Sequence, residues 1–424
     1  MGLPIEPRLR SDQQSLFYEA VTRARDHLLL TRPYLADDGE TWVASPFWNA
    51  VRALYEVGAP LRARTEGARA LSDCASRVEL LTAAVRHRRL PSTFPDLVAD
   101  WRNLRYAGQI LRARLARDYR GPLDGHLPDL PAILGKRFGP RYVWSASALE
   151  TYAGCGFRFL IGHALALEEL ETPAAGYDVA QQGRMLHEIL EKVYRQASDP
   201  ADTESVLQVL PQVAQEVFAA APAKFGFRPL LIWDKQQAEL LERLAETVRN
   251  LADEEAGFRP TYFEKRFGAP PLAVETSAGT ILFRGLIDRV DVNAQGDLNV
   301  IDYKTGVSQL DVRALGEGIV LQLALYALAA EKALKLGRVA DGFYWGILKG
   351  KASSLRLSRF KFTAPDSAEY SGMSDAIALT LKHIGAYIEG IRTGHFIPIP
   401  PRGDCPSYCV AKSICWRYQP AEHL

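Results

Sequence analysis

Two neighbouring strand-like segments, FRGLIDRVDV and LNVIDYKTG, constrain the fold of this chain most strongly. The turn-forming residues NAQGD join them, which predicts a β-hairpin. Because side chains two positions apart on a strand share a face, Asp302 and Lys304 of the second segment are predicted to point the same way. A carboxylate among Val, Ile and Tyr is costly to bury unless a cation lies beside it. The hairpin therefore predicts either a structural salt bridge or a cation site.

Helix and strand patterns alternate around this hairpin. Helical spacing of apolar residues covers about 145–167, 179–197, 204–220, 234–256, 311–336 and 367–393. Strand patterns are PTYFEKRFG, TILFRGLIDRVDV, LNVIDYKT, GFYWGILK and LRLSRFKFT. Strands that alternate with longer helices are typical of an α/β domain, which is expected to occupy residues 141–424.

The first third of the chain has a different character. Residues 46–120 carry apolar positions at helical intervals, so a helical region is predicted there. The following stretch is rich in Gly and Pro, and residues 121–140 are predicted to form a linker.

Three polar side chains stand out on the predicted helices. His187 lies in GRMLHEILEKVY beside an apolar stripe, and a single histidine in this setting is more often solvated than a ligand. Gln322 and Tyr326 are four apart in VLQLALYALA and share one face of an otherwise apolar helix. Together with the charged hairpin, these side chains predict a site.

Phosphodiester hydrolysis is the chemistry that suits such a set. Oxygen ligands from Asp288 and Asp302 would hold Mg²⁺ or Mn²⁺ and leave positions for water and phosphate. His187 could complete the metal shell, since imidazole suits Mn²⁺ better than Mg²⁺. Lys304 would orient the attacking water or stabilise the charge that develops on phosphorus.

The charge balance limits how the chain could bind DNA. It has 51 Lys and Arg against 50 Asp and Glu, a formal net charge of +1, which excludes a polybasic protein that coats nucleic acid. Basic residues cluster locally at 86–90, 102–120 and 349–361. These clusters are as consistent with solvated faces as with phosphate contacts. For the aromatic residues Tyr344, Trp345 and Trp416, core packing is a commoner role than stacking on bases.

The cysteines are few and unevenly placed. Five cysteines in 424 residues are too sparse for a disulfide-built secreted fold, and the sequence shows neither a signal peptide nor an apolar run long enough to cross a membrane. A cytoplasmic protein is expected. Cys405, Cys409 and Cys415 form C-x3-C-x5-C, a metal-site pattern that needs a fourth ligand, for which Cys155 is the candidate. Zinc and an iron–sulfur cluster both remain open, and Cys74 is predicted to be a buried helix thiol.

Taken together, GRMLHEILE, GLIDRVD, VIDYKTG and QLALY resemble, in this order, the RecB-like nucleases of the PD-(D/E)XK superfamily. The resemblance implies a restriction-endonuclease-like core, with a mixed central sheet flanked by helices. It assigns the metal-binding acidic pair to Asp288 and Asp302, the catalytic lysine to Lys304, and the family histidine to His187. Its QxxxY motif corresponds to Gln322 and Tyr326. Asp291 has no catalytic counterpart and is expected to be a strand-end charge.

One cysteine before this core and three after it resemble the iron–sulfur staple of AddB-type nucleases and of CRISPR-associated single-strand exonucleases. The resemblance implies a 4Fe–4S cluster held by four thiolates, Cys155, Cys405, Cys409 and Cys415, that ties the two ends of the nuclease domain together. C-x3-C departs from the commoner C-x2-C, which puts the local loop geometry in question. A staple across so long a loop is expected to restrain the unfolded chain.

The N-terminal SLFYEAVTRARDHLLLT resembles motif VI of UvrD-like helicases, with Arg23 at the position of the motif's arginine. No G-x4-G-K-S/T phosphate loop occurs, so no ATPase activity is expected from this chain alone. Residues 1–45 are interpreted as the end of a helicase-like module. This order is AddB-like and implies a DNA nuclease, with exonuclease action expected, that serves DNA end processing and double-strand break repair with a helicase partner of AddA or UvrD type. The alternatives are a stand-alone single-strand exonuclease of the CRISPR-associated type and a non-catalytic DNA-binding subunit.

Overall fold

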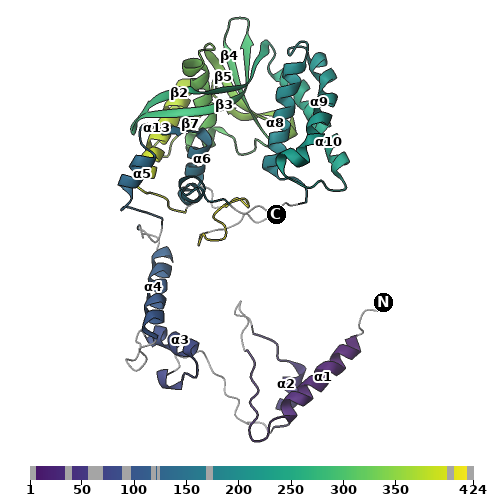
Figure 1. The fold of residues 1–424 in the computed structure, drawn as a ribbon, viewed down its shortest axis with the longest axis vertical. Coiled ribbons are helices and arrows are strands. Elements are labelled where there is room, and N and C mark those ends of the chain that lie inside the picture. The colour runs from purple at the N-terminus through teal and green to yellow at the C-terminus, as the bar shows by residue number, and fades with distance from the viewer. Residues whose placement is uncertain are drawn as a thin grey trace. The chain divides into compact units, whose positions relative to one another are not determined.

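A computed structural model describes residues 6–33, 41–55, 70–87, 97–115, 121, 125–168, 175–398 and 405–417 of the chain. The chain divides into two compact units, Met1–Arg105 and Tyr106–Leu424. Each unit is described by itself below (Figure 1). None of the helices in the described ranges is both long and apolar enough to cross a membrane.

The N-terminal unit is helical, as its apolar spacing predicts. It contains α1 (Glu6–Thr22), α2 (Pro46–Arg52), a short 3₁₀ turn (Leu71–Asp73), α3 (Arg77–His87) and the start of α4 (Val98–Leu115). Ser45 caps α2 by accepting the backbone N–H of Trp48 at 3.2 Å, and proline occupies the first turn, where its missing N–H costs nothing. Cys74 ends the 3₁₀ turn and is half-buried, so the prediction of a buried helix thiol is wrong.

A mixed six-stranded sheet forms the centre of the larger unit. Its strands are β1 (Val143–Trp144), β2 (Phe258–Thr276), β3 (Gly279–Asn293), β4 (Leu298–Lys304), β5 (Val339–Gly346) and β6 (Lys351–Arg356). The order is β1-β3-β4-β5-β6, with β2 also paired to β3. The β1–β3 and β4–β5 pairs are parallel and the others antiparallel. A separate small sheet consists of β7 (Lys361–Thr363) and β8 (Glu369–Ser371).

Helices cover both faces of this sheet, which confirms the predicted α/β architecture (Figure 1). One core joins the sheet to α8 (Val179–Gln196), α9 (Thr203–Phe225) and α10 (Trp233–Glu254). The other joins it to α5 (Pro131–Arg137), α6 (Ala146–Gly154), α7 (Gly156–Phe159), α11 (Val312–Gly316), α12 (Gln322–Leu328) and α13 (Gly372–Arg392). π-helical turns extend α7 over Leu160–Ala164 and α12 over Ala329–Ala333. A large apolar surface is thus buried on each side of the strands that carry the charged residues.

The predicted linker at 121–140 is wrong where this stretch is described. Residues 131–137 form α5, and Phe138 is fully buried in the core. Backbone hydrogen bonds join Leu127 N–H to Gly394 and Phe396 N–H to Gly125, each at 2.8 Å. Gly and Pro mark a turn-rich segment here, but its partner lies far away in sequence, at the end of α13.

Candidate active site

The charged hairpin opens at one end, and the site begins at this opening. The last paired residues of β3 and β4 on this side are Arg289 and Ile301. One position beyond, the Asp288 carboxylate accepts the backbone N–H of Tyr303 at 2.7 Å, in place of a strand-to-strand bond. Asp288 is only 8% exposed. The hairpin therefore holds this carboxylate rigidly at the point where its two strands diverge.

Asp302 and Lys304 lie on one face of β4, as predicted, and form an ion pair through Asp302 Oδ2. Asp302 is fully buried, yet neither of its carboxylate oxygens receives a well-formed hydrogen bond from the described residues. Burial, with the nearby charge of Asp288, raises the pKa of Asp302 against the opposing effect of Lys304. A buried carboxylate with open lone pairs is poorly satisfied by a lysine alone and suits a cation.

A chain of hydrogen bonds runs from Lys304 to the helix that follows β4. Lys304 Nζ donates to Gln322 Oε1 at 2.9 Å, and Gln322 Nε2 donates to Tyr326 Oη at 2.7 Å. These contacts bring the predicted lysine, glutamine and tyrosine together. Burial lowers the pKa of Lys304, but the charges of Asp302 and Asp288 outweigh it and raise that pKa overall. The lysine is accordingly a fixed cation in this arrangement.

His187 reaches the same site from α8. Its Nε2 lies 3.1 Å from the backbone oxygen of Tyr303, which can only accept, so Nε2 carries the hydrogen. Nδ1 then presents its lone pair 3.5 Å from Asp288 Oδ2 when the ring is neutral. Burial lowers the pKa of His187, but the charge and hydrogen bond of Asp288 and the charge of Asp302 outweigh it and raise the pKa. Such a backbone-anchored imidazole is the usual arrangement of a metal-binding histidine.

Glu264 of β2 belongs to the site, although the sequence patterns did not reveal it. Ligand atoms of His187, Glu264 and Asp288 lie within 4.8 Å of one another, close enough to hold one metal ion. Glu264 has a φ of 47°, a left-handed conformation that is uncommon for residues other than glycine, and it is skipped in the β2–β3 pairing. Burial and the charge of Asp288 raise the pKa of Glu264 to about 7. Asp302 is not a member of this three-residue set, although it lies near enough to influence both pKa values.

Asp291 is not the strand-end charge that the sequence suggested. It is fully buried and forms two hydrogen bonds of 2.6 Å with the buried guanidinium of Arg289. The guanidinium lies 4.5 Å from the ring centre of Tyr194 and 3.4 Å from Tyr303 Oη. Both charges are satisfied, and the pair packs against α8. Asp291 is therefore a structural residue.

The four predicted cysteine ligands come together. Cys155 separates α6 from α7, and the three C-terminal cysteines lie in the segment 405–417. Burial raises the pKa of Cys155 and Cys415, and the neighbouring thiols raise both further. Phe157 packs on Trp416 with ring centres 5.3 Å apart, and Arg158 lies over Tyr408 at 4.9 Å. The two sequence-distant segments thus form one unit around the thiols.

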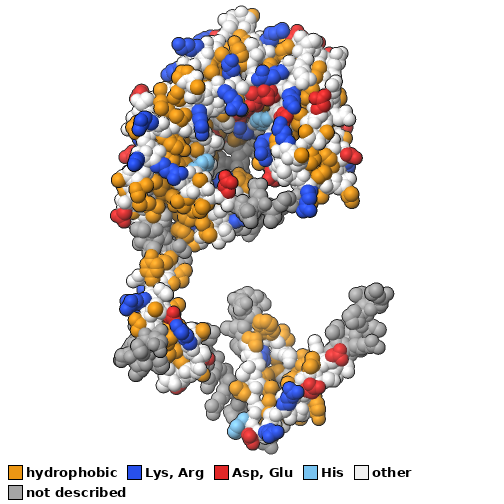
Figure 2. All heavy atoms as spheres, viewed as in Figure 1, with side chains coloured by type: hydrophobic (Ala, Val, Ile, Leu, Met, Phe, Trp, Pro, Cys, Tyr) orange, Lys and Arg blue, Asp and Glu red, His pale blue; other side chains and the backbone are white. Residues whose placement is uncertain are grey.

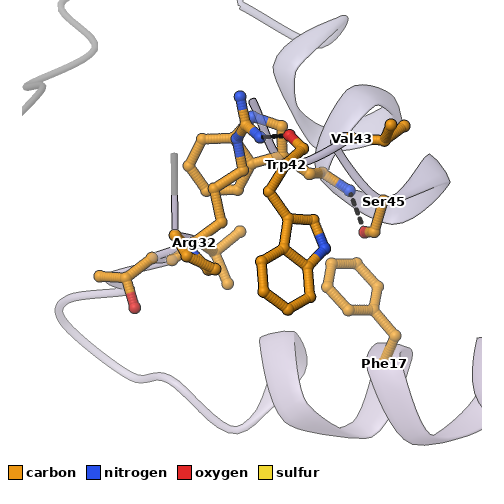
Figure 3. A pocket seen from close by; sticks show the side chains of 9 residues that line it. Phe17, Arg32, Trp42, Val43 and Ser45 are labelled. Carbon is orange, nitrogen blue, oxygen red and sulfur yellow. Dashed lines mark hydrogen bonds between the residues drawn. The ribbon is translucent and has the colours of Figure 1, made fainter. Parts of the chain in front are cut away.

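A pocket of about 290 Å³ lies in the N-terminal unit, between α1 and α2 (Figure 3). Aromatic and aliphatic side chains dominate its lining, including Phe17, Trp42 and Trp48. The guanidinium of Arg32 donates to the backbone oxygen of Trp42 at 2.9 Å. No acid, histidine or cysteine lines this pocket, so it offers no hydrolytic chemistry. Arg23, at the position of the helicase-like arginine, is exposed just beyond α1.

Basic side chains surround the acidic site without forming a continuous positive surface. Figure 2 shows Lys and Arg side chains on both sides of a hollow in which Asp, Glu and His side chains are visible. Of the arginines on α4, Arg102, Arg105 and Arg112 are exposed, while the side chain of Arg114 and all of Arg117 and Arg120 lie outside the described residues. Tyr344 and Trp345 are buried and belong to the core.

Comparison with known proteins settles the family. The sequence profile of the PD-(D/E)XK nuclease superfamily matches residues 143–416, which include the sheet, the acidic site and the cysteine site. The chain belongs to the PD-(D/E)XK nuclease superfamily. This membership confirms the resemblance drawn from the four sequence motifs and the restriction-endonuclease-like fold that it implies.

Relatives of this superfamily member are named as the AddB subunit of an ATP-dependent helicase/deoxyribonuclease. The protein of Moorella thermoacetica is 31% identical over 363 residues, which are 78% of this chain and 30% of the relative. That of Symbiobacterium thermophilum is 27% identical over 352 residues, 75% of this chain and 30% of the relative. That of Desulforamulus reducens is 25% identical over 362 residues, 77% of this chain and 30% of the relative. The chain thus spans about a third of the length of these relatives.

Proposed function

We propose that this chain is a metal-dependent DNA nuclease of AddB type, with exonuclease action on DNA ends, that works with a helicase partner of AddA type. The observation that carries the proposal is the connected site of Asp288, Asp302, Lys304 and Gln322, with His187 and Glu264 beside it. The named activity of the relatives supports DNA as the substrate and a helicase as the partner. The cysteine site, built from unpaired thiols, supports a cytoplasmic location.

The donor atoms at the site fit a divalent cation such as Mg²⁺ or Mn²⁺. Three carboxylates and one imidazole converge, and Lys304 is the cation that faces them. We propose His187, Glu264 and Asp288 as ligands, joined by Asp302, whose oxygens lack hydrogen-bond donors among the described residues. A bound metal would lower the pKa of its water and offset phosphate charge.

The other residues would act on water and phosphate directly. Lys304, a fixed cation next to Asp302, would orient the attacking water and stabilise charge on the phosphoryl oxygens. Gln322 would hold Nζ at the required angle, since its own amide is fixed by Tyr326. The ordered chain from Tyr326 to Lys304 leaves one direction for the lysine, toward the carboxylates.

We also propose that Cys155, Cys405, Cys409 and Cys415 hold a 4Fe–4S cluster. A tetrahedral zinc site with Zn–S bonds of about 2.3 Å needs sulfur atoms about 4 Å apart. Among the described residues, no three of these sulfur atoms lie within 4.8 Å of one another. An iron–sulfur cluster binds each thiolate to a different iron, so its ligands are spaced more widely. Backbone N–H groups of Phe157 and Arg158 directed at Cys155 favour its thiolate.

The helicase-like part of the proposal concerns the N-terminus. We propose residues 1–45 as the end of a helicase-like module, 46–120 as a helical region and 141–424 as the nuclease domain. Residues 125–138 belong with the nuclease fold, because they pair with the end of α13 and bury Phe138. Arg23 would be the trace of motif VI.

Anaerobic purification followed by a cleavage assay tests the proposal. We expect absorbance near 400 nm with about four irons per chain, and cleavage of end-labelled single-stranded or duplex DNA in Mn²⁺ or Mg²⁺. Lys304→Ala should abolish cleavage, whereas the exposed Lys361→Ala on β7 should retain it. Wild-type protein that leaves DNA intact in both metals would overturn the nuclease. A colourless protein with zinc would overturn the cluster alone.

A further inference from the structure

Glu150 of α6 holds the start of the helix that carries Gln322. Its Oε1 accepts the backbone N–H of Leu321 at 2.7 Å and that of Gln322 at 2.9 Å. The first N–H groups of a helix have no partner within the helix, so an external carboxylate there satisfies them and interacts favourably with the helix dipole. Glu150 lies 171 positions before Leu321, and this contact therefore fixes α12 against a distant element.

The first turn of α12 in turn fixes the catalytic lysine. Gln322 is the first residue of α12, and its side chain accepts from Lys304 Nζ. Tyr344 Oη accepts the next backbone N–H, that of Leu323, at 3.3 Å, and the ring of Tyr344 lies 5.4 Å from Lys304 Nζ. The charge of Glu150 also acts on Lys304. A shift of this turn would move the hydrogen-bond acceptor of the lysine.

The other end of α6 is part of the cysteine site. Cys155 directly follows the helix and donates its backbone N–H to Thr151 at 2.9 Å. Glu150 and Cys155 are thus little more than one helical turn apart. Tyr152, between them, donates its hydroxyl to the backbone oxygen of His395 at 2.7 Å, so the helix is anchored along its length. A short, anchored helix transmits a displacement of one end to the other.

We propose that Glu150 is a positioning residue that couples the cysteine site to the catalytic lysine through the first turn of α12. Formation of the metal site at Cys155 fixes the end of α6, Glu150 then fixes Leu321 and Gln322, and Gln322 fixes Lys304. The role of Lys304 rests on the function proposed above, whereas the contact between Glu150 and α12 does not.

Three substitutions in the full chain test the positioning step. Glu150→Ala removes both acceptor bonds, and Glu150→Gln keeps an oxygen that can accept them. Glu331→Ala is the matched control, because Glu331 also accepts a backbone N–H, that of Val339 at 2.7 Å, near the far end of the same helical segment. The measurements are kcat and KM on end-labelled DNA in Mn²⁺, metal content, and hydrogen exchange of the peptide covering residues 319–324.

We expect Glu150→Ala to lower kcat by about 10- to 100-fold with KM nearly unchanged, since the lysine acts in the transition state. Exchange at Leu321 and Gln322 should quicken at unchanged metal content. Glu150→Gln should restore most of kcat, and Glu331→Ala should keep both kcat and this exchange at wild-type values. Unchanged kcat in Glu150→Ala, or an equal loss in Glu331→Ala, would overturn the positioning role.

Cys409→Ser tests the coupling from the other side, because Cys409 lies in the C-terminal segment and not on α6. We expect the same rise in exchange at Leu321 and Gln322 when the cysteine site is lost. Wild-type exchange in Cys409→Ser would overturn the coupling. Wild-type protein that cleaves no DNA would remove the proposed nuclease function, while the exchange data would still decide whether Glu150 connects the two sites.

Discussion

Two charge pairs with the same spacing lie on adjacent strands, and they have opposite characters. Arg289 and Asp291 on β3 are both buried and joined by two short hydrogen bonds. Asp302 and Lys304 on β4 also form an ion pair, but the oxygens of Asp302 receive no well-formed hydrogen bond from the described residues, and the lysine shares its bonds with Gln322. The first pair is closed and the second is open.

The difference shows what identifies a functional charge in a core. A buried ion pair with all its hydrogen bonds made contributes to structure, and removing one partner is costly. A buried carboxylate with open lone pairs weakens the metal-free fold and favours a cation. Tyr303 connects the two pairs, since its hydroxyl contacts Arg289 while its backbone binds Asp288 and His187.

The largest expected effect is on the open pair. Asp302→Asn should lower the rate of DNA cleavage by roughly 10³-fold or more, because it removes a metal-binding charge. The free energy of unfolding should stay within about 1 kcal/mol of wild type or rise, because an unsatisfied buried charge is lost. Cleavage rates and denaturant unfolding measure the two effects. Asp297→Asn, in the turn of the same hairpin, is the control; an equal loss of rate there would contradict the assignment.

The closed pair should behave in the opposite way. Asp291→Ala leaves the guanidinium of Arg289 buried without its partner, so the free energy of unfolding should fall by about 3–5 kcal/mol. Folded molecules should keep cleavage within a few-fold of wild type, because Asp291 is absent from the metal-binding set. Urea unfolding and cleavage per folded molecule check this. A stable but inactive Asp291→Ala protein would erase the contrast between the pairs.

Metal binding should act only on the open side of the comparison. At Mn²⁺ concentrations about 100 times the Kd, the fold should gain about 2.7 kcal/mol, since the ion binds only the folded site. Thermal unfolding with and without Mn²⁺ measures this gain. Asp288→Asn should lose most of it, whereas a full gain in that variant would place the metal elsewhere.

The smallest effect concerns Glu255, which lies beside the closed pair. Burial, with the charge of Asp291, raises its pKa from 4.5 to about 7, against the hydrogen bond from Asn299. The fold therefore retains a proton that the unfolded chain loses, and stability falls as pH rises from about 4.5 through about 7. Glu255→Gln should add on the order of 2 kcal/mol at pH 8 and little at pH 4. Unfolding at both pH values measures it, and an equal gain at each would contradict the shift.

Local patterns in the sequence predicted the parts of the site that lie on regular elements. The two-residue spacing of Asp302 and Lys304 gave their shared face, and the four-residue spacing of Gln322 and Tyr326 gave their hydrogen bond. Alternating apolar runs also predicted the β3–β4 hairpin. Each of these features depends on the period of a strand or a helix, which neighbouring residues determine.

Features that depend on distant partners escaped the same reasoning. Glu264 projects into the site from an irregular point of β2, and strand alternation does not predict such a point. Glu150 acts on a helix far along the chain. Asp291 is buried only because helices pack over its strand, and residues 125–127 are ordered by pairing with the end of α13.

A titration of DNA cleavage against Mn²⁺ occupancy in one sample tests the central claim most directly. Free Mn²⁺ is followed by electron paramagnetic resonance while the cleavage rate of end-labelled DNA is recorded. We predict no cleavage in EDTA and a rate that rises in step with ion binding, with both lost in Asp288→Asn. Undiminished cleavage in EDTA, or Mn²⁺ binding and cleavage retained by Asp288→Asn, would contradict the account.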